Sequence, residues 1–340
     1  MSATAVGMTT IVIAGVIGSA TLLPMKFVRR WEWENTWLLY AAHAYLIFPL
    51  IVAWWTIPQL GSVYVEAGWS QVWPVVAYGF GWGISVVMLG LAVASMGLAV
   101  STGIIMGSSI ALGSLIPLLW LEADAVTAGQ TTRVLVADGL ILLGVALCAR
   151  AGYVRERDQN RAAAQGAGGD ASAARGIAIC LAAGVLTTLL NLALASGREI
   201  ARIAVAAGAA ENDAANAVWG LAVSAGAMPS LIYCLVLLYR NRSWNHFRST
   251  ERVRNAVICV AMAAFFITAT VGYGMGAVRM GDLGPAIGWP VYISTLIIGN
   301  NWWGWLTSEW RGAPPSAFST MLAGVALQVA GILFLSLGGG

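Results

Sequence analysis

Two ionisable side chains, His43 and Asp138, stand inside long apolar stretches of the sequence. Imidazole and carboxyl groups bind and release protons, and an ionisable group inside a membrane is costly to bury and is by default a candidate functional site. Both residues are therefore candidate proton-coupling groups. For His43 a second interpretation stays open, in which the neutral ring is a core histidine whose hydrogen bonds are satisfied.

Residues suited to binding a sugar also occur deep in the apolar stretches. Trp82 and Trp289 lie away from the stretch ends, where other tryptophans are expected to anchor the membrane interface. A flat apolar ring beside amide or hydroxyl groups matches the C–H face and the hydroxyls of a sugar. The predicted polar partners are Asn191, Tyr273, Ser294 and Asn300. Core aromatics and helix-bridging amides are the structural alternative at each of these positions.

Small residues recur in the apolar run 97–121, among them Ser101, Gly103 and Gly107. They leave one face of the helix without bulky side chains, so that another helix or a solute can come close. Ser101 and Gly107 are counted as candidate substrate contacts, with ordinary helix packing as the alternative.

The apolar run 284–307 contains two prolines near its start, Pro285 and Pro290. Each removes a backbone donor, so the pair predicts a broken or kinked helix, which a membrane tolerates beside neighbouring protein or a wet cavity. Helix interruptions at matching places in two halves of a chain are typical of transport sites.

A charged cluster follows the first apolar stretch and comprises Lys26, Arg29, Arg30, Glu32 and Glu34. We expect these groups to form ion pairs at the membrane interface, and a gate that opens and closes is the functional alternative. Lys26, Arg29 and Glu34 are the candidate gate residues.

The composition of the 340 residues is far from that of soluble proteins, with 59% apolar and 10% charged residues. Soluble domains carry about 25% charged residues, so a soluble globular protein is excluded. The net charge of +3 is too small and too scattered for a nucleic-acid-binding surface. The four cysteines show no metal-type spacing, and neither a metal nor a cofactor is predicted.

The chain supplies apolar runs of the length that a membrane requires, about 20 residues per helix. The predicted fold is therefore an all-α polytopic membrane protein with ten transmembrane helices. The runs cover approximately 6–25, 36–57, 73–93, 97–121, 133–151, 175–197, 215–239, 255–277, 284–307 and 316–337.

The distribution of positive charge predicts the orientation. Most of the 18 lysines and arginines follow the odd-numbered runs. Loops rich in Lys and Arg stay in the cytoplasm, so both termini are expected outside the cytoplasmic membrane.

A polar, Gly- and Ala-rich segment at 155–174 has the composition of a flexible linker. It divides the chain into a first five-helix repeat, 1–154, and a second, 175–340. Because each half has an odd number of spans, the halves are expected to run in opposite directions, as in inverted-repeat transporters.

Two pairs of short segments echo each other across the halves. Gly90 to Gly97 resembles Gly274 to Gly281 in the spacing of its glycines and in its penultimate methionine. Ala-Gly-Val around Gly15 is repeated in the second half at Gly184. Chance recurrence in apolar helices is the alternative, and it is weakened because both pairs occur in the order that a duplication requires.

The stretch 24–37, PMKFVRRWEWENTW, resembles the opening of the L-rhamnose–proton symporter family, a branch of the drug/metabolite transporter superfamily. The likeness continues through Gly81-Trp82-Gly83, Arg150-Ala151-Gly152 and Glu309-Trp310 and covers nearly the whole chain. This resemblance implies ten helices in two inverted five-helix repeats, a plasma-membrane location, and proton-driven uptake of a small sugar.

The sequence departs from that family at one position. Enteric members carry an aspartate shortly before the tryptophan of their ninth span, where this chain has Pro285. The resemblance therefore supplies no proton-coupling residue, and His43 or Asp138 would have to replace it.

The leading function is a secondary transporter of the bacterial inner membrane that gives a small sugar and protons alternating access to a central pocket. The alternative is an exporter or facilitator of another small metabolite without proton coupling. An enzyme is disfavoured because no catalytic motif such as HExxH occurs, and a membrane sensor because no loop is long enough for an output domain. The oligomeric state stays open.

Overall fold

The structure, a computed structural model, describes residues 2–121, 127–159 and 170–336, and these residues form helices joined by short turns. The first half contains α1 (Ala3–Ser19), η1 (Leu23–Phe27), α2 (Trp33–Ala41), η2 (Ala42–Ile47), α3 (Phe48–Thr56), α4 (Leu60–Met96), α5 (Leu98–Ile116), η3 (Pro117–Leu121) and α6 (Ala128–Gln159). The second contains α7 (Asp170–Ser196), α8 (Arg198–Ala206), η5 (Glu211–Asp213), α9 (Ala215–Asn241), η6 (Ser243–Arg248), α10 (Arg252–Arg279), η7 (Gly281–Leu283), α11 (Gly284–Leu306) and α12 (Pro315–Ser336). The all-helical prediction is confirmed for the described residues.

Within the described residues, nine helical stretches are long and apolar enough to cross a membrane. They comprise α1, the α2–η2–α3 segment, α4, α5, α6, α7 with α8, α9, α10 and α12. The predicted ninth run at 284–307 is the helix α11, which has the length of a span but does not reach the mean hydropathy of these nine stretches. Its prolines, glycines, tryptophans and paired asparagines account for that difference.

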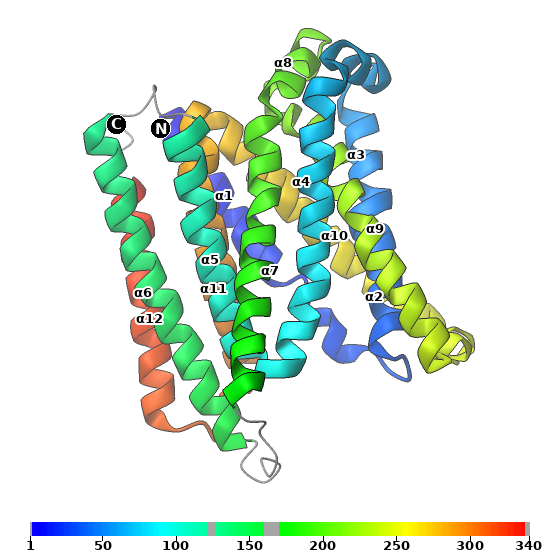
Figure 1. Ribbon diagram of the computed structural model, residues 1–340, viewed down its shortest axis with the longest axis vertical. Coiled ribbons are helices and arrows are strands. Elements are labelled where there is room, and N and C mark those ends of the chain that lie inside the picture. Colours follow the sequence, from blue (N-terminus) through cyan, green and yellow to red (C-terminus); the bar gives the residue numbers. More distant parts are fainter. Residues whose placement is uncertain (1, 122–126, 160–169, 337–340) are drawn as a thin grey trace.

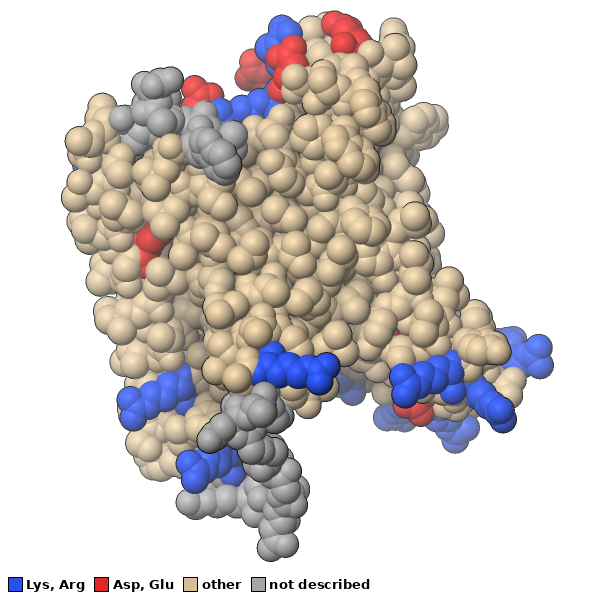
Figure 2. Space-filling view, in the orientation of Figure 1, with Lys and Arg blue, Asp and Glu red and all other residues tan. Residues whose placement is uncertain are grey.

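The helices form a bundle in which α6 and α12 pair at one edge and α2, α3, α4 and α9 lie toward the other (Figure 1). Both chain termini lie at the same end of this bundle. Lysines and arginines gather at the opposite end, and a broad belt of surface with few charged groups, among them one acidic group at its left edge, separates the two ends (Figure 2). Such a belt between polar ends is what a bilayer requires of a spanning protein.

The close crossing of α4 and α9 depends on small residues. A Cβ atom at Gly79 would lie 2.0 Å from the carbonyl oxygen of Ala222, and one at Gly83 would lie 2.2 Å from that of Gly226. Lipid gives helices no hydrophobic incentive to associate, so close backbone contact of this kind is a main source of packing energy.

Gly7 on α1 and Gly176 on α7 each lie eight residues before a glycine of the echoing pair Gly15 and Gly184, and they make similar contacts. A Cβ at Gly7 would lie 2.8 Å from Cγ of Met280, at the end of α10, and one at Gly176 would lie 2.5 Å from Cγ of Met96, at the end of α4. The methionines are those of the two echoing sequence segments. The glycines that follow them, Gly97 and Gly281, both have a positive φ, 81° and 66°.

A chain of contacts also fixes the direction of α1 relative to α7. Lys26, just after α1, pairs with Glu309, and Glu309 pairs with Arg155 near the end of α6. The neighbouring Glu156 accepts from the backbone N–H of Ala99 at the start of α5. Since Gly176 near the start of α7 packs on the end of α4, α1 ends at the same face where α7 begins. The two helices are therefore antiparallel.

The structure bears on two local expectations. The helix α11 is continuous from Gly284 to Leu306, so the predicted break is absent: Pro285 lies in its first turn, where a missing N–H is tolerated, and Pro290 lies within it. The described parts of the predicted linker 155–174 are helical, since α6 continues to Gln159 and α7 begins at Asp170; residues 160–169 lie outside the described part of the chain.

The replacement Gly79→Ala should destabilise the fold by about 1–3 kcal/mol, because the added methyl group meets the rigid backbone of α9. The measurement is thermal unfolding of the purified protein in detergent. Gly90→Ala on the same helix is the matched control, since nothing lies within 4 Å of its added atom. Equal unfolding temperatures for the two variants would contradict the packing described for α4 and α9.

Candidate functional site

The side chain of Asn191 joins four helices in the interior. It lies on α7, is 0% exposed, and its Nδ2 donates to the carbonyl oxygens of Gly113 on α5, at 2.8 Å, and Pro285 on α11, at 3.0 Å. Its Oδ1 accepts from the hydroxyl of Tyr273 on α10. The amide uses both hydrogens of its nitrogen and its oxygen, which is what a polar group needs where no water or lipid partner exists.

Trp289 lies next to this amide. Its Nε1 donates to the carbonyl oxygen of Ser109 at 3.1 Å and to the Ser109 hydroxyl at 3.2 Å. Gly113 makes room for the ring, because a Cβ there would lie 2.3 Å from a ring carbon. The edge of Tyr273 faces the ring at 5.5 Å between centroids. The predicted residues Asn191, Tyr273 and Trp289 thus form one cluster, which we call the Asn191 cluster.

Trp82 belongs to a second aromatic cluster. Its ring contacts Tyr45 edge-on at 5.1 Å and stacks on Phe266 at 6.1 Å between centroids, and the edge of Tyr40 faces Tyr45 at 5.4 Å. Gly226 on α9 gives the Trp82 ring its space. Tyr45 lies in η2, a π-helical turn, and such turns occur frequently at functional sites.

The other predicted substrate contacts are dispersed. Ser294 is buried and donates to the Pro290 carbonyl of its own helix at 2.6 Å. Ser101 is buried on α5, and its hydroxyl has no hydrogen-bond partner. Gly107 faces α6, and Asn300 is exposed.

The two candidate proton-coupling residues have different environments. The Nδ1 atom of the half-buried His43 is bonded to the Leu39 carbonyl of its own helix at 2.8 Å, and Phe48 meets the ring edge-on. Asp138 on α6 is 4% exposed, and both of its carboxyl oxygens lack a hydrogen-bond partner. The polar side chain that acts on it is Ser114 of α5.

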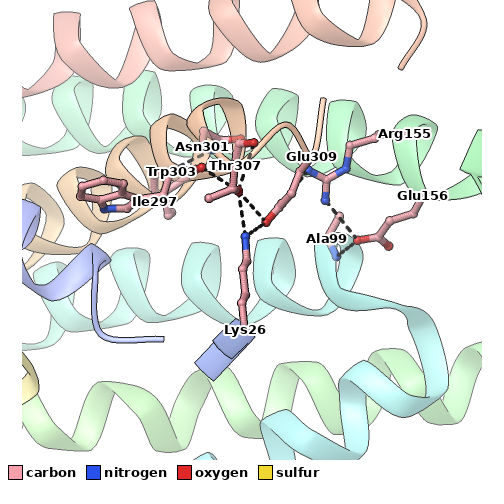
Figure 3. A network of polar contacts seen from close by, with 10 residues as sticks. Lys26, Ala99, Arg155, Glu156, Ile297, Asn301, Trp303, Thr307 and Glu309 are labelled. Carbon is pink, nitrogen blue, oxygen red and sulfur yellow. Dashed lines mark hydrogen bonds and ion pairs between the residues drawn. The ribbon is translucent and has the colours of Figure 1, made fainter. Parts of the chain in front are cut away.

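A polar network lies at the basic end of the bundle (Figure 3). Nζ of Lys26 pairs with Glu309 and donates to the hydroxyl of Thr307 at 2.8 Å. Glu309 also pairs with Arg155 at 3.3 Å, and the Arg155 guanidinium lies 5.0 Å from the centre of the Trp310 ring. We call these residues, with Glu156, the Lys26 network.

The remaining two gate candidates lie outside the Lys26 network. The backbone of Arg29 exchanges two hydrogen bonds with the Asn255 side chain on α10, at 3.3 and 2.7 Å. The buried Glu34 accepts from Asn241 at 3.0 Å and from Ser243 at 2.6 Å. Both therefore connect the first half of the chain to the second half, at separate places.

Two surface pockets lie near the ends of helices. One, of about 390 Å³, is lined by Trp305, Trp310, Phe318 and neighbouring residues, and the other, of about 550 Å³, by Trp54, Trp55 and residues up to Ser62. Neither is lined by Trp82 or Trp289, whose rings are packed against protein in this conformation. The Asn191 cluster is thus closed.

The predicted site residues did not include several groups that complete these sites. Ser109 and Gly113 on α5 supply partners to Trp289 and Asn191, Ser114 lies close to Asp138, and Arg155 completes the Lys26 network. Residue type alone does not single out these serines and this glycine. The sequence places Glu309 at the end of an apolar run, but its partners Lys26 and Arg155 are distant in sequence and could not be predicted.

The fold and the interior define a multi-pass helical membrane protein with buried polar and aromatic groups at helix crossings. The sequence model of the family described as L-rhamnose-proton symport protein (RhaT) matches residues 1–338. The chain belongs to this family, which consists of transport proteins and not of enzymes.

Relatives named L-rhamnose-proton symporter occur in several bacteria. The L-rhamnose-proton symporter of Cronobacter sakazakii is 23% identical over 322 residues, which cover 93% of this chain and 92% of the relative. The symporter of Mannheimia succiniciproducens is 26% identical over 219 residues, covering 63% and 62%. That of Citrobacter koseri is 21% identical over 308 residues, covering 88% of each protein.

Replacing Asn191 by Ala should lower the stability by about 2 kcal/mol, because two carbonyls and the Tyr273 hydroxyl lose a buried partner. Thermal unfolding in detergent measures the effect. Asn301→Ala is the control, since this half-buried amide donates only within its own helix, to Ile297. An Asn191 variant as stable as the Asn301 variant would show that the cluster does not hold the four helices together.

Proposed function

We propose that this chain is a secondary transporter that takes up L-rhamnose or a related small sugar together with protons by alternating access. The family match over residues 1–338 and the names of the relatives support the substrate class. The observation that carries the proposal is the Asn191 cluster, in which one amide and one indole reach four helices. A sugar that replaces these bonds with its own hydroxyls would change how the helices are joined.

We propose the residues of the Asn191 cluster as the core of the sugar site, with Trp82 as a second aromatic wall. In the closed conformation the Asn191 side-chain N–H groups donate to backbone carbonyls. They are held in place, but they are not free to bind a sugar. Sugar hydroxyls donate and accept, and can therefore take the place of those carbonyls without leaving an amide hydrogen unpaired. Ser101 and Ser294 are further buried hydroxyls on α5 and α11 that a ligand could reach after opening.

We further propose that the chain forms ten spans, α11 being the ninth in chain order, in two inverted five-helix repeats at 1–154 and 175–340 joined by the linker 155–174. Several observations support this. The antiparallel α1 and α7, the matching contacts of Gly7 and Gly176, and the positive φ angles of Gly97 and Gly281 are each expected from an inverted duplication. In addition, Gly15 on α1 packs on α11 while Gly184 on α7 packs on α5, the equivalent helix.

The proposed location is the bacterial inner membrane, with the basic end in the cytoplasm and both termini outside. Clustering of lysines and arginines at the end opposite to the termini supports this orientation (Figure 2). The Lys26 network then closes the cytoplasmic side. It joins the segment after α1 to the ends of α6 and α11, so it must separate when that side opens.

Proton-coupled transport predicts that proteoliposomes containing the purified protein concentrate labelled L-rhamnose when the outside is acidic. A proton ionophore should abolish accumulation, because the gradient supplies the energy. Uptake that only equilibrates, with or without the ionophore, would instead identify a facilitator and contradict proton coupling. Trp289→Ala should lose uptake, whereas the exposed Trp69→Ala should keep it.

The proposed gate predicts that Glu309→Gln favours opening of the basic face by about 1 kcal/mol, or roughly five-fold, because it weakens the contacts of both Lys26 and Arg155. The readout is the alkylation rate of a cysteine placed at the buried Ser101 position. Glu251→Gln is the matched control, since its pair with Arg254 lies outside the network. Equal alkylation rates in the two backgrounds would rule out the gate.

A further inference from the structure

The segment of α5 from Ser109 to Ser114 lies between the Asn191 cluster and a buried acid. On one side, Ser109 accepts from Trp289, and the Gly113 carbonyl accepts from Asn191. On the other side, the adjacent Ser114 lies close to Asp138 of α6, without a hydrogen bond between them in this conformation. One short piece of helix therefore contacts both the proposed sugar site and the acid.

Asp138 is buried without the partners that a carboxylate requires. It is 4% exposed, Ser114 is 0% exposed, and neither the two carboxyl oxygens nor the serine hydroxyl has a hydrogen bond. Asp138 is the eleventh residue of α6, about 15 Å along the helix. An unpaired carboxylate in such a position is very costly, whereas a neutral carboxylic acid is far less so.

The surroundings of Asp138 contain no compensating charge among the described residues. The helices α5, α11 and α12 pack against α6, and no ion pair of Asp138 with any of their described residues occurs. Gln328 of α12 faces Cys148 and Gly324, further along α6 and α12. The nearest polar support is thus the Ser114 hydroxyl, which donates to a carboxylate but is not itself ionised at neutral pH.

We propose that Asp138 is the proton-binding residue and that Ser114, as a positioning residue, couples it to the sugar site through α5. This inference rests on the proposed function. His43 is a weaker candidate, because its ring nitrogen already has a backbone partner within its own helix.

The proposed proton transfer forms and later breaks a single O–H bond. One proton from the outer solution forms an O–H bond on the Asp138 carboxylate, is carried while the site changes face, and leaves that oxygen for the cytoplasmic solution. No other bond forms or breaks, and the side chain alternates between −1 and 0. When it is ionised, the Ser114 hydroxyl can turn and donate to it, and Ser114 directly follows Gly113, whose carbonyl accepts from Asn191.

The first test compares Asp138→Asn with wild type in two assays on proteoliposomes. One assay is accumulation driven by a proton gradient, and the other is exchange of labelled for unlabelled L-rhamnose without a gradient. The asparagine mimics the neutral acid, so accumulation should be lost while exchange is kept within about two-fold. Glu66→Gln, which alters an exposed carboxylate, is the control and should keep both activities.

Retained accumulation by Asp138→Asn, or loss of both activities in a variant that unfolds at the wild-type temperature, overturns the proposal. If wild type itself exchanges but never accumulates, the proposed proton coupling fails first, which is a distinguishable result.

If Asp138→Asn does not fold, the variant Ser114→Ala tests the proposal instead. Without the Ser114 hydroxyl, the ionised form of Asp138 is less stable relative to the neutral acid. The pH above which uptake stops should therefore rise by about half a unit or more. Ser230→Ala removes an equally buried and unpartnered hydroxyl on α9 and should leave the limit in place. Identical pH profiles for both serine variants overturn the role of Ser114.

Discussion

The absence of water in the bilayer interior is the constraint on which the structure depends, because every polar group placed there must find its partner within the protein. Asn191 satisfies it by giving both hydrogens of its nitrogen to backbone carbonyls and by accepting from Tyr273. An amide bonded in this way fixes α5, α7, α10 and α11 relative to one another. If sugar binds at this cluster, as proposed, it must offer equivalent partners, and binding and helix rearrangement are then the same event.

Close helix packing provides the second element of this arrangement. Glycine contacts between α4 and α9, and between α1 and α10, bring backbones together without side chains that would interlock. Surfaces of this kind can shift in small steps, whereas the polar contacts at the Asn191 cluster and the Lys26 network are either made or broken. A carrier that alternates between two arrangements open to opposite faces requires both kinds of contact.

The sequence was sufficient to predict the helices and several relations between them. Apolar runs of span length specify helices in a membrane, and the echo between the segments ending at Gly97 and Gly281 reappears as a positive φ at both glycines. The partners of the predicted polar residues could not be derived. Asn191 donates to the carbonyls of Gly113 and Pro285. Because every residue has a backbone carbonyl, the sequence does not indicate which of them accept a hydrogen bond. The continuity of α11 through Pro290 likewise depends on packing by neighbouring helices, which a local pattern does not contain.

The central claim is that binding of sugar and proton shifts the protein between arrangements open to opposite faces. Distances between spin labels on cysteines at the exposed Arg157 and Asn245 positions, both near the basic end, test it directly, since the native cysteines are buried. With L-rhamnose at acidic pH, we expect a second, longer distance to join the one found for the arrangement described above. A single distance that is unchanged by sugar and pH would contradict alternating access.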